Sequence, residues 1–213
     1  PEDCLVELEP ESDSRLVDEA TIESFLHDHG SEIALVLWPG VQYASGQAFD
    51  LARIAHAGRN AGACVGVDLA HSIGNLPLSL HDSGCDFAAW CSYKYLNGGP
   101  GAVAACFVHE RHGGSGHLPR FQGWWGNHRE SRFRMDPDFQ ATPGAGAWQL
   151  SNPPILAMAS LRASLQLFQE AGMLALRQKS LAMTAWLDAM IETELSGVIE
   201  IITPRDPLRR GCQ

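Results

Sequence analysis

The chain has 213 residues with a formal net charge of −10, 45% hydrophobic residues and 19% charged residues. This composition excludes general disorder and is typical of a globular chain with a sizeable core. The acidic balance disfavours a nucleic-acid surface, and no apolar run in the sequence is long enough to span a membrane. The opening "PEDCLVELEP" has no signal pattern, so we expect a cytoplasmic protein.

The first half of the chain alternates between helical and strand-like patterns. Spaced apolar residues predict helices over 18–29 and 49–62. Continuous apolar runs predict buried strands at 33–38, 63–68, 86–92 and 102–110. Strand–helix–strand units with short connections are typical of α/β proteins. We therefore expect a mostly parallel sheet with helices on both faces.

The second half of the chain has a different organisation. Residues 111–150 are rich in glycine, aromatic and charged residues without periodicity, which predicts a long functional loop region. Later patterns predict two helices, over 155–172 and 174–195, and a strand at 198–203. We therefore expect residues 1–150 to belong to a large α/β domain. Residues 151–213 are expected to provide connecting helices and the beginning of a smaller α+β domain.

Both ends of the sequence are unusual. Residue 1 is a proline, and the chain stops at "TPRDPLRRGCQ", directly after the strand expected at 198–203. No closing element follows that strand. The sequence therefore predicts a part of a longer chain.

The six cysteines lie at positions 4, 64, 85, 91, 106 and 212, without a C-x-x-C pair. Cys64, Cys91 and Cys106 fall in apolar runs, where a free cysteine behaves as a small hydrophobic residue. We expect reduced, buried cysteines that form neither disulfides nor a thiolate metal site.

Lys94 lies within an apolar and aromatic segment, "DFAAWCSYKYLNGGPGAVA". A lysine in such surroundings pairs with a carboxylate, gives up its proton or forms a covalent bond. Asp68 ends the strand expected at 63–68, and α/β sheets bind ligands beyond the carboxyl ends of their strands. Two interpretations stay open. Asp68 and Lys94 form a structural ion pair, or they serve pyridoxal phosphate, with the lysine as Schiff base and the aspartate on the pyridinium nitrogen.

Neighbouring residues are compatible with the second interpretation. His71 follows Asp68 by three residues and can stack on or hydrogen-bond near a planar ring, although a half-buried structural histidine has the same pattern. Tyr93 precedes the lysine and can donate its hydroxyl to a phosphate, or simply pack as an amphipathic aromatic. The "NGGPG" segment permits close backbone approach to a ligand, and it is also a good turn.

Five segments together resemble the kynureninases, which are class V pyridoxal-phosphate enzymes with the aspartate-aminotransferase fold: "DLAHSIGN", "DFAAWCSYKYLNGGPGAVA", "FVHERH", "GWWG" and "SNPPI". The similarity runs in order from about residue 33 to the end, and "WCSYKYLN" is its most specific part. Cysteine desulfurases share the Asp…Lys scheme but usually carry "DAAQ"-like and "SxHK"-like versions. Those versions do not occur here.

The resemblance implies a role for each matching residue. Lys94 would be the Schiff-base lysine of the pyridoxal phosphate, Asp68 the pyridinium partner and His71 a cofactor contact. Tyr93 would reach the cofactor phosphate. These residues would place the pyridoxal-phosphate site in the domain formed by residues 1–150.

Two further residues would act across a homodimer interface. The resemblance makes Trp124, rather than Trp125, the cofactor contact of the "GWWG" motif, and it makes Asn152 a second contact. Either residue can instead be structural. Trp124 can be a core or interface aromatic, and Asn152 can cap the helix expected to begin at 155.

The other polar residues of the loop region do not indicate a ligand site. The histidines of the loop region have no carboxylate at ligand spacing, so we expect no metal site at His109, His112, His117 and His128. Three arginines of the same region suggest a solvated face more than an anion site: Arg129, Arg132 and Arg134.

The implied reaction is the hydrolysis of L-kynurenine, or its 3-hydroxy form, to L-alanine and anthranilate or 3-hydroxyanthranilate, a step of tryptophan catabolism. In the family, segments outside the matching motifs supply a phosphate-binding loop, a ring-stacking aromatic and an arginine for the substrate carboxylate. We therefore expect the 213-residue chain alone to bind the cofactor poorly and to be nearly inactive. The alternatives are another class V enzyme, such as a cysteine desulfurase or lyase, and a non-catalytic sheet protein.

Overall fold

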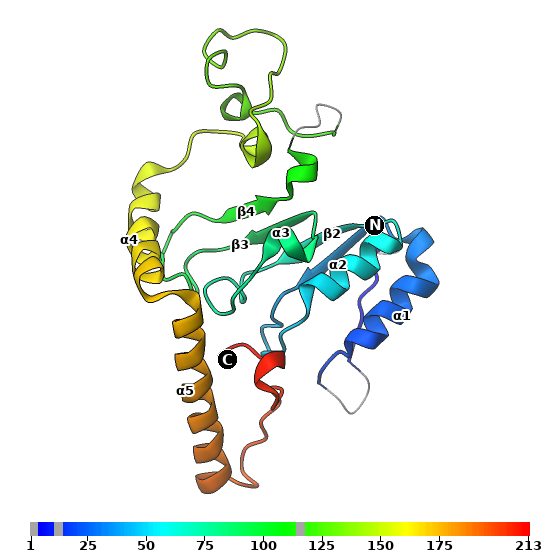
Figure 1. Cartoon of the computed structure of the whole chain (residues 1–213), viewed down its shortest axis with the longest axis vertical. Helices are drawn as coiled ribbons and strands as arrows, with labels where there is room; N and C mark the ends of the chain where they lie inside the picture. The colour runs from blue at the N-terminus through cyan, green and yellow to red at the C-terminus, as the bar shows by residue number, and fades with distance from the viewer. Residues whose placement is uncertain (1–3, 11–14, 114–117) are drawn as a thin grey trace.

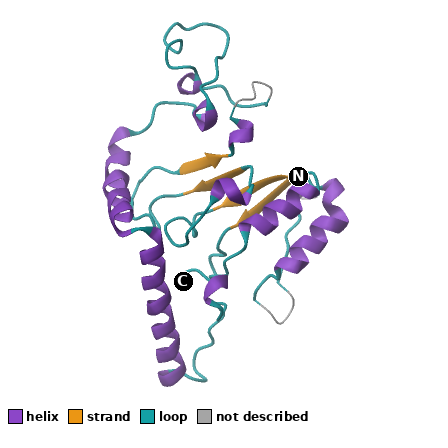
Figure 2. Ribbon diagram, in the orientation of Figure 1, coloured by secondary structure: helices purple, strands orange, loops and turns teal. Residues whose placement is uncertain are grey.

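The computed structural model describes residues 4–10, 15–113 and 118–213. The β-strands are β1 (Leu35–Pro39), β2 (Cys64–Asp68), β3 (Phe87–Trp90) and β4 (Ala105–Val108). The α-helices are α1 (Glu19–His29), α2 (Leu51–Asn60), α3 (Leu80–Ser83), α4 (Ile155–Ala171) and α5 (Met173–Glu194). Short 3-10 helices are η2 (Gly30–Glu32), η3 (Glu110–His112), η4 (Trp124–Gly126), η5 (Gly144–Trp148) and η6 (Pro207–Arg209). Figures 1 and 2 show the four strands in the middle of an α/β structure, which confirms the predicted class.

The four strands form one sheet in the order β1-β2-β3-β4. β1, β2 and β3 are parallel, and β4 is antiparallel to β3. The predicted mostly parallel sheet is therefore confirmed. β4 runs the opposite way because the glycine-rich connection at 91–104 contains no crossover helix, which a parallel return requires. Pro39, Asp68 and Ala89 are register partners, so the parallel strands end at one edge of the sheet.

Helix α2 packs closely on one face of the sheet. It begins after Asp50, whose Oδ1 accepts hydrogen bonds from the backbone N–H groups of Ala52 and Arg53. Gly58 allows the close approach, because a Cβ there would lie 2.6 Å from Val65 Cγ2. The main core lies between the sheet and helices α1 and α2. Its fully buried members include Ile22, Ile54, Val65, Val67, Leu69 and Cys85.

The opposite face of the sheet stays open in the described part of the chain. Leu35 and Leu37 are 50% and 61% exposed, and Cys64 and Cys106 are exposed as well. Side chains alternate between the two faces of a strand, which directs these residues away from α2. The prediction of buried cysteines is therefore wrong for Cys64 and Cys106, and it is also wrong for the exposed Cys4. All six cysteines are free, and burial raises the pKa of Cys85.

The second half of the chain contains both predicted helices but not the final strand. α4 and α5 lie along one side of the molecule (Figure 1), and in the described ranges no helix has the length and apolarity needed to cross a membrane. Residues 198–203 are irregular, which corrects the predicted strand. Val198 and Ile199 are exposed and pair with no sheet edge among the described strands. The boundary expected at residue 150 stays a prediction.

The C-terminal segment returns to the loop that follows β1. Arg210 pairs with Gln47 in an isolated antiparallel bridge. The Ala48 N–H donates to Arg209 O, and the Gly211 N–H donates to Gly46 O, both at 2.9 Å. The red end of the ribbon in Figure 1 accordingly lies between α5 and the loops below the sheet. This return brings the last residues close to the carboxyl ends of the strands.

Candidate functional site

Asp68, His71 and Lys94 meet at the carboxyl-end edge of the sheet. Asp68 is the last residue of β2, and the following turn, with Ser72 N–H donating to Leu69 O at 2.9 Å, places His71 beside it. Lys94 follows β3 and approaches from the neighbouring loop. Its Nζ lies 2.9 Å from His71 Nε2. Residues 23 positions apart in the sequence therefore form one polar contact at the predicted edge.

Lys94 contacts the imidazole rather than a carboxylate. Within the described ranges no ion pair within 4.0 Å joins Lys94 to Asp68 or to any other acid, so the structural ion pair considered from the sequence is wrong. Burial lowers the pKa of His71, and a positive charge on Lys94 lowers it further, while Asp68 acts in the opposite direction. A neutral imidazole is the form that these contacts favour.

A cavity of about 310 Å³ opens beside Asp68 and His71. It is lined by Leu37, Trp38, Pro39, Val41, Gln42, Tyr43, Asp68 and His71. The aromatic rings of Tyr43 and Tyr95 lie with their centroids 6.2 and 6.1 Å from that of His71. Burial, together with Cys212, raises the pKa of Tyr95 to about 12, so its hydroxyl keeps its proton at neutral pH.

The groups at this edge fit pyridoxal phosphate. Oδ1 of Asp68 accepts a hydrogen bond from the Ala70 N–H at 2.8 Å. Among the described residues no hydrogen bond reaches its other oxygen, and the side chain is exposed at the cavity. A carboxylate suits a protonated ring nitrogen, and a primary amine suits an aldehyde. The amine of Lys94, 2.9 Å from His71 Nε2, completes this set.

The structure adds two residues that the sequence analysis missed. Gln213 Nε2 lies 3.1 Å from His71 Nδ1, although the residues are 142 positions apart. Asn75 is buried and donates through Nδ2 to His71 O at 2.9 Å. Asn75 ends the "DLAHSIGN" motif and bonds to His71 locally, whereas the contact of Gln213 with His71 depends on the return of the C-terminal segment.

Tyr93 and Trp124 do not join this group. Tyr93 is 55% exposed, and its neighbour Cys91 raises the Tyr93 pKa. Trp124 is 45% exposed, with its ring 5.7 Å from Trp125 and 5.4 Å from Phe133. Neither makes a hydrogen bond or ring contact with Asp68, His71 or Lys94 among the described residues. Their predicted cofactor roles stay predictions.

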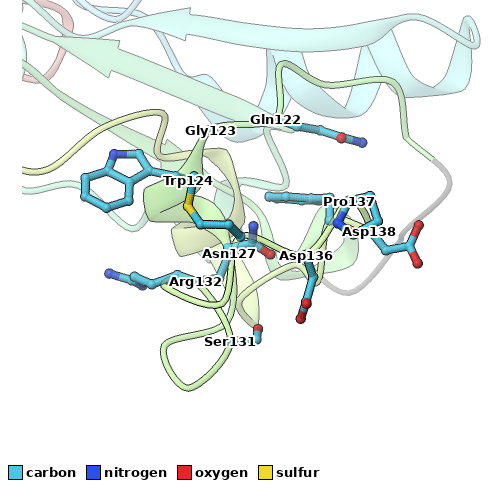
Figure 3. A pocket seen from close by; sticks show the side chains of 11 residues that line it. Gln122, Gly123, Trp124, Asn127, Ser131, Arg132, Asp136, Pro137 and Asp138 are labelled. Carbon is cyan, nitrogen blue, oxygen red and sulfur yellow. Dashed lines mark hydrogen bonds between the residues drawn. The ribbon is translucent and has the colours of Figure 1, made fainter.

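Trp124 lines a second cavity, of about 230 Å³, within the loop region (Figure 3). Its other lining residues are Gln122, Gly123, Asn127, Ser131, Arg132, Met135, Asp136, Pro137, Asp138 and Phe139. The Arg132 guanidinium lies 4.3 Å from the Trp125 ring centroid and donates to the Trp125 and Asn127 carbonyls. Arg132 therefore holds the loop together rather than forming part of a solvated face. The cavity includes none of the three residues at the sheet edge.

Asn152 is exposed and accepts a hydrogen bond from Ser151 Oγ at 3.1 Å. α4 begins at Ile155, with Pro154 in the N-cap position and no side-chain cap. The capping role considered for Asn152 is therefore wrong. This contact does not involve the sheet edge, so a role of Asn152 at the cofactor stays a prediction.

The histidines of the loop region have structural contacts. His109 is buried and stacks on His81 at 4.7 Å, and His112 Nε2 lies 2.6 Å from Asp86 Oδ1. The backbone of His128 bonds to Gln140 O. His117 lies outside the described residues. In the described ranges no three His, Cys, Asp or Glu residues are grouped as metal ligands.

Comparison with known proteins identifies similar chains. A family model described as aminotransferase class-V matches residues 6–211. A kynureninase of Stenotrophomonas maltophilia (strain K279a) is 59% identical over 213 residues, and one of Xanthomonas oryzae pv. oryzae (strain PXO99A) is 56% identical. Both alignments cover 100% of this chain and 50% of the relative, so the chain spans about half the length of these curated relatives.

Solved structures share the fold at low sequence identity. A cysteine desulfurase from Thermococcus onnurineus NA1 has a TM-score of 0.72 at 17% identity, covering 97% of this chain and 48% of that one. A pyridoxamine-pyruvate aminotransferase from Mesorhizobium loti has a TM-score of 0.56 at 20% identity, with coverage of 83% and 43%.

Proposed function

Because the chain belongs to the class V aminotransferase family, we propose that the full-length protein is a kynureninase that uses pyridoxal phosphate. The observation that carries the proposal is the identity of 56–59% to kynureninases along the whole chain, together with the Asp68–His71–Lys94 group at the sheet edge. The cysteine desulfurase structure shares only the fold, since its identity is 17%. The substrate would be L-kynurenine or its 3-hydroxy form, which is cleaved with water to L-alanine and anthranilate or 3-hydroxyanthranilate.

When bound, pyridoxal phosphate supplies an electron-accepting ring for the carbon atoms next to the substrate amine. Asp68 would hold the ring nitrogen through its exposed carboxylate and favour a positive charge there, which would strengthen that electron demand. Lys94 would hold the cofactor through its amine, and the same amine could act as general base for the proton at the substrate Cα. His71, with its Nε2 2.9 Å from Nζ, would hold the amine in place.

We further propose a homodimer in which Trp124 and Asn152 complete the site of the partner subunit. Their exposure and their separation from the Asp68–His71–Lys94 group support this arrangement. The loop region and α4 also expose apolar side chains that a second subunit could cover: Phe121, Phe133, Met135, Ile155 and Leu156. A cytoplasmic location belongs to the same proposal.

The direct test is an activity measurement on the full-length protein loaded with pyridoxal phosphate. We expect release of fluorescent anthranilate from L-kynurenine, and a parallel assay with 3-hydroxykynurenine ranks the two substrates. Sulfide release from L-cysteine, without anthranilate release, would instead indicate a desulfurase. The 213-residue chain alone is expected to turn over little or nothing, and strong activity of this chain would contradict that expectation.

Replacement of Asp68 by asparagine tests the role of the carboxylate. The amide would keep the size of the side chain and the hydrogen bond from the Ala70 N–H, but it would carry no negative charge. We expect the loaded full-length enzyme to lose about a hundredfold or more in kcat, since removal of one electrostatic contact at a developing charge costs roughly 10²–10³-fold. The matched control is Asp82→Asn, on an exposed aspartate of α3, which should leave the rate unchanged. Equal rates for Asp68→Asn and the wild type would reject this role.

A further inference from the structure

A continuous polar chain leads from the C-terminal segment to Lys94. The Cys212 N–H donates to Asn75 Oδ1 at 3.0 Å, and Asn75 Nδ2 lies 3.5 Å from Gln213 Oε1. Gln213 Nε2 lies 3.1 Å from His71 Nδ1, and His71 Nε2 lies 2.9 Å from Lys94 Nζ. The order is therefore Cys212, Asn75, Gln213, His71, Lys94.

Backbone groups fix the orientation of Asn75. Its oxygen accepts from the Cys212 N–H, which can only donate. Its nitrogen donates to the His71 carbonyl at 2.9 Å, which can only accept. The second hydrogen of the Asn75 amide then faces Gln213 Oε1. A rotated amide would place like groups together at both backbone contacts.

The orientation of Asn75 determines that of Gln213. With Oε1 toward the Asn75 donor, the Gln213 amide nitrogen faces His71 Nδ1 and donates to it. Gly211 packs against this pair, because a Cβ there would lie 2.6 Å from both Asn75 Nδ2 and Gln213 Oε1. Arg210 also donates to the Gln213 carbonyl at 3.2 Å, which fixes the backbone at this position.

We propose that Asn75 and Gln213 are positioning residues that hold His71 in the tautomer with its proton on Nε2. A neutral imidazole has one protonated nitrogen, so an Nδ1 that accepts from Gln213 leaves the hydrogen on Nε2. That hydrogen points at Lys94 Nζ and needs a lone pair there. The polar chain therefore directs the His71 Nε2 hydrogen at the amine of Lys94. The contribution of this polar chain to catalysis rests on the function proposed above. The tautomer of His71 does not depend on that function.

The first experiment reads the tautomer by nitrogen NMR of the full-length protein without cofactor, labelled with ¹⁵N in histidine. His71 signals are assigned from their loss in His71→Asn. We expect Nε2 to carry the proton in the wild type. Gln213→Glu, which can only accept, should move the proton to Nδ1, and Gln213→Met should give a mixture. A proton on Nδ1 in the wild type, or the same tautomer in all three proteins, would overturn the proposal.

The second experiment measures amine reactivity. The two lysines of the chain are Lys94 and the exposed Lys179, so labelling by an amine-selective reagent and peptide mapping give their ratio in one sample. Gln213→Glu should lower labelling of Lys94 relative to Lys179 by about tenfold, the shift that one hydrogen bond of typical strength produces. The control Gln166→Glu adds the same charge on the exposed face of α4 and should leave the ratio unchanged.

These results are separate from the proposed activity. Neither measurement uses substrate or cofactor, so an inactive protein with the expected tautomer would reject the kynureninase proposal alone. If the protein is active but Gln213→Glu does not change the labelling of Lys94, only the positioning role is rejected. Equal thermal unfolding of Gln213→Met and the wild type checks that the fold is intact.

Discussion

Replacement of Lys94 by alanine in the full-length protein is expected to lower kcat/KM for L-kynurenine by about a thousandfold or more. General acid–base work by a positioned side chain alone contributes roughly 10²–10⁴-fold, and Lys94 is also the proposed attachment point of the cofactor. Anthranilate release measures the loss. His71 would remain beside the site without an amine to contact. A variant with the wild-type rate would remove Lys94 from the mechanism.

The matched control is Lys179→Ala, since Lys179 is the other lysine of the chain and is exposed on α5. It should leave the rate unchanged. Borohydride reduction of the loaded wild-type protein followed by peptide mapping should place a pyridoxyl label on Lys94 and none on Lys179. A label on a lysine outside this chain, with none on Lys94, would contradict the assignment.

Asp86 is expected to have the largest effect on stability. The residue is 7% exposed and connects β2 to η3, since its Oδ2 accepts from the Val65 N–H at 2.7 Å. Its Oδ1 accepts from Arg111 Nε at 2.9 Å and contacts His112 Nε2 at 2.6 Å. Asp86→Ala would leave Arg111 Nε and the Val65 N–H without their acceptor, although Arg111 Nη2 would keep the Gly84 and Cys85 carbonyls. We expect a loss of about 3–5 kcal/mol in the free energy of unfolding, the usual cost of breaking a buried pair.

Urea unfolding of the full-length protein measures this loss. Asp82→Ala removes an aspartate with an 83% exposed side chain from the same region, and it should change stability by less than about 0.5 kcal/mol. Equal stability of the two variants would show that the Asp86 contacts contribute nothing.

The effect of Asp86 should also depend on pH. Burial raises the pKa of Asp86, but the Val65 N–H, His112 and Arg111 together outweigh burial and lower it. A lowered pKa means that the stabilisation is complete above the unfolded-state value, about 4, and is lost as the pH falls through the folded-state value. The difference between the wild type and Asp86→Ala should therefore be constant at neutral pH and shrink in acid. A difference that grows on acidification would contradict this cause.

Local patterns in the sequence determined most of the central sheet and the polar residues at its carboxyl-end edge. Apolar runs at 33–38 and 63–68 correspond to β1 and β2, and the pattern at 49–62 corresponds to α2. These elements are encoded locally because burial on both faces of a parallel strand requires a continuous apolar run. The positions of Asp68 and Lys94 beyond two neighbouring strands follow from the same patterns. The family could likewise be identified from contiguous motifs.

Tertiary structure decided what depends on distant neighbours. The apolar segment at 198–203 has the composition of a strand but no sheet edge to pair with, and Cys64 and Cys106 lie on a face that the described residues leave open. The partner of Lys94 turned out to be His71 rather than Asp68, and the contact of His71 with Gln213 spans 142 positions. Composition and periodicity report which side chains prefer burial. Which polar atoms face one another is decided only when the chain has folded back on itself.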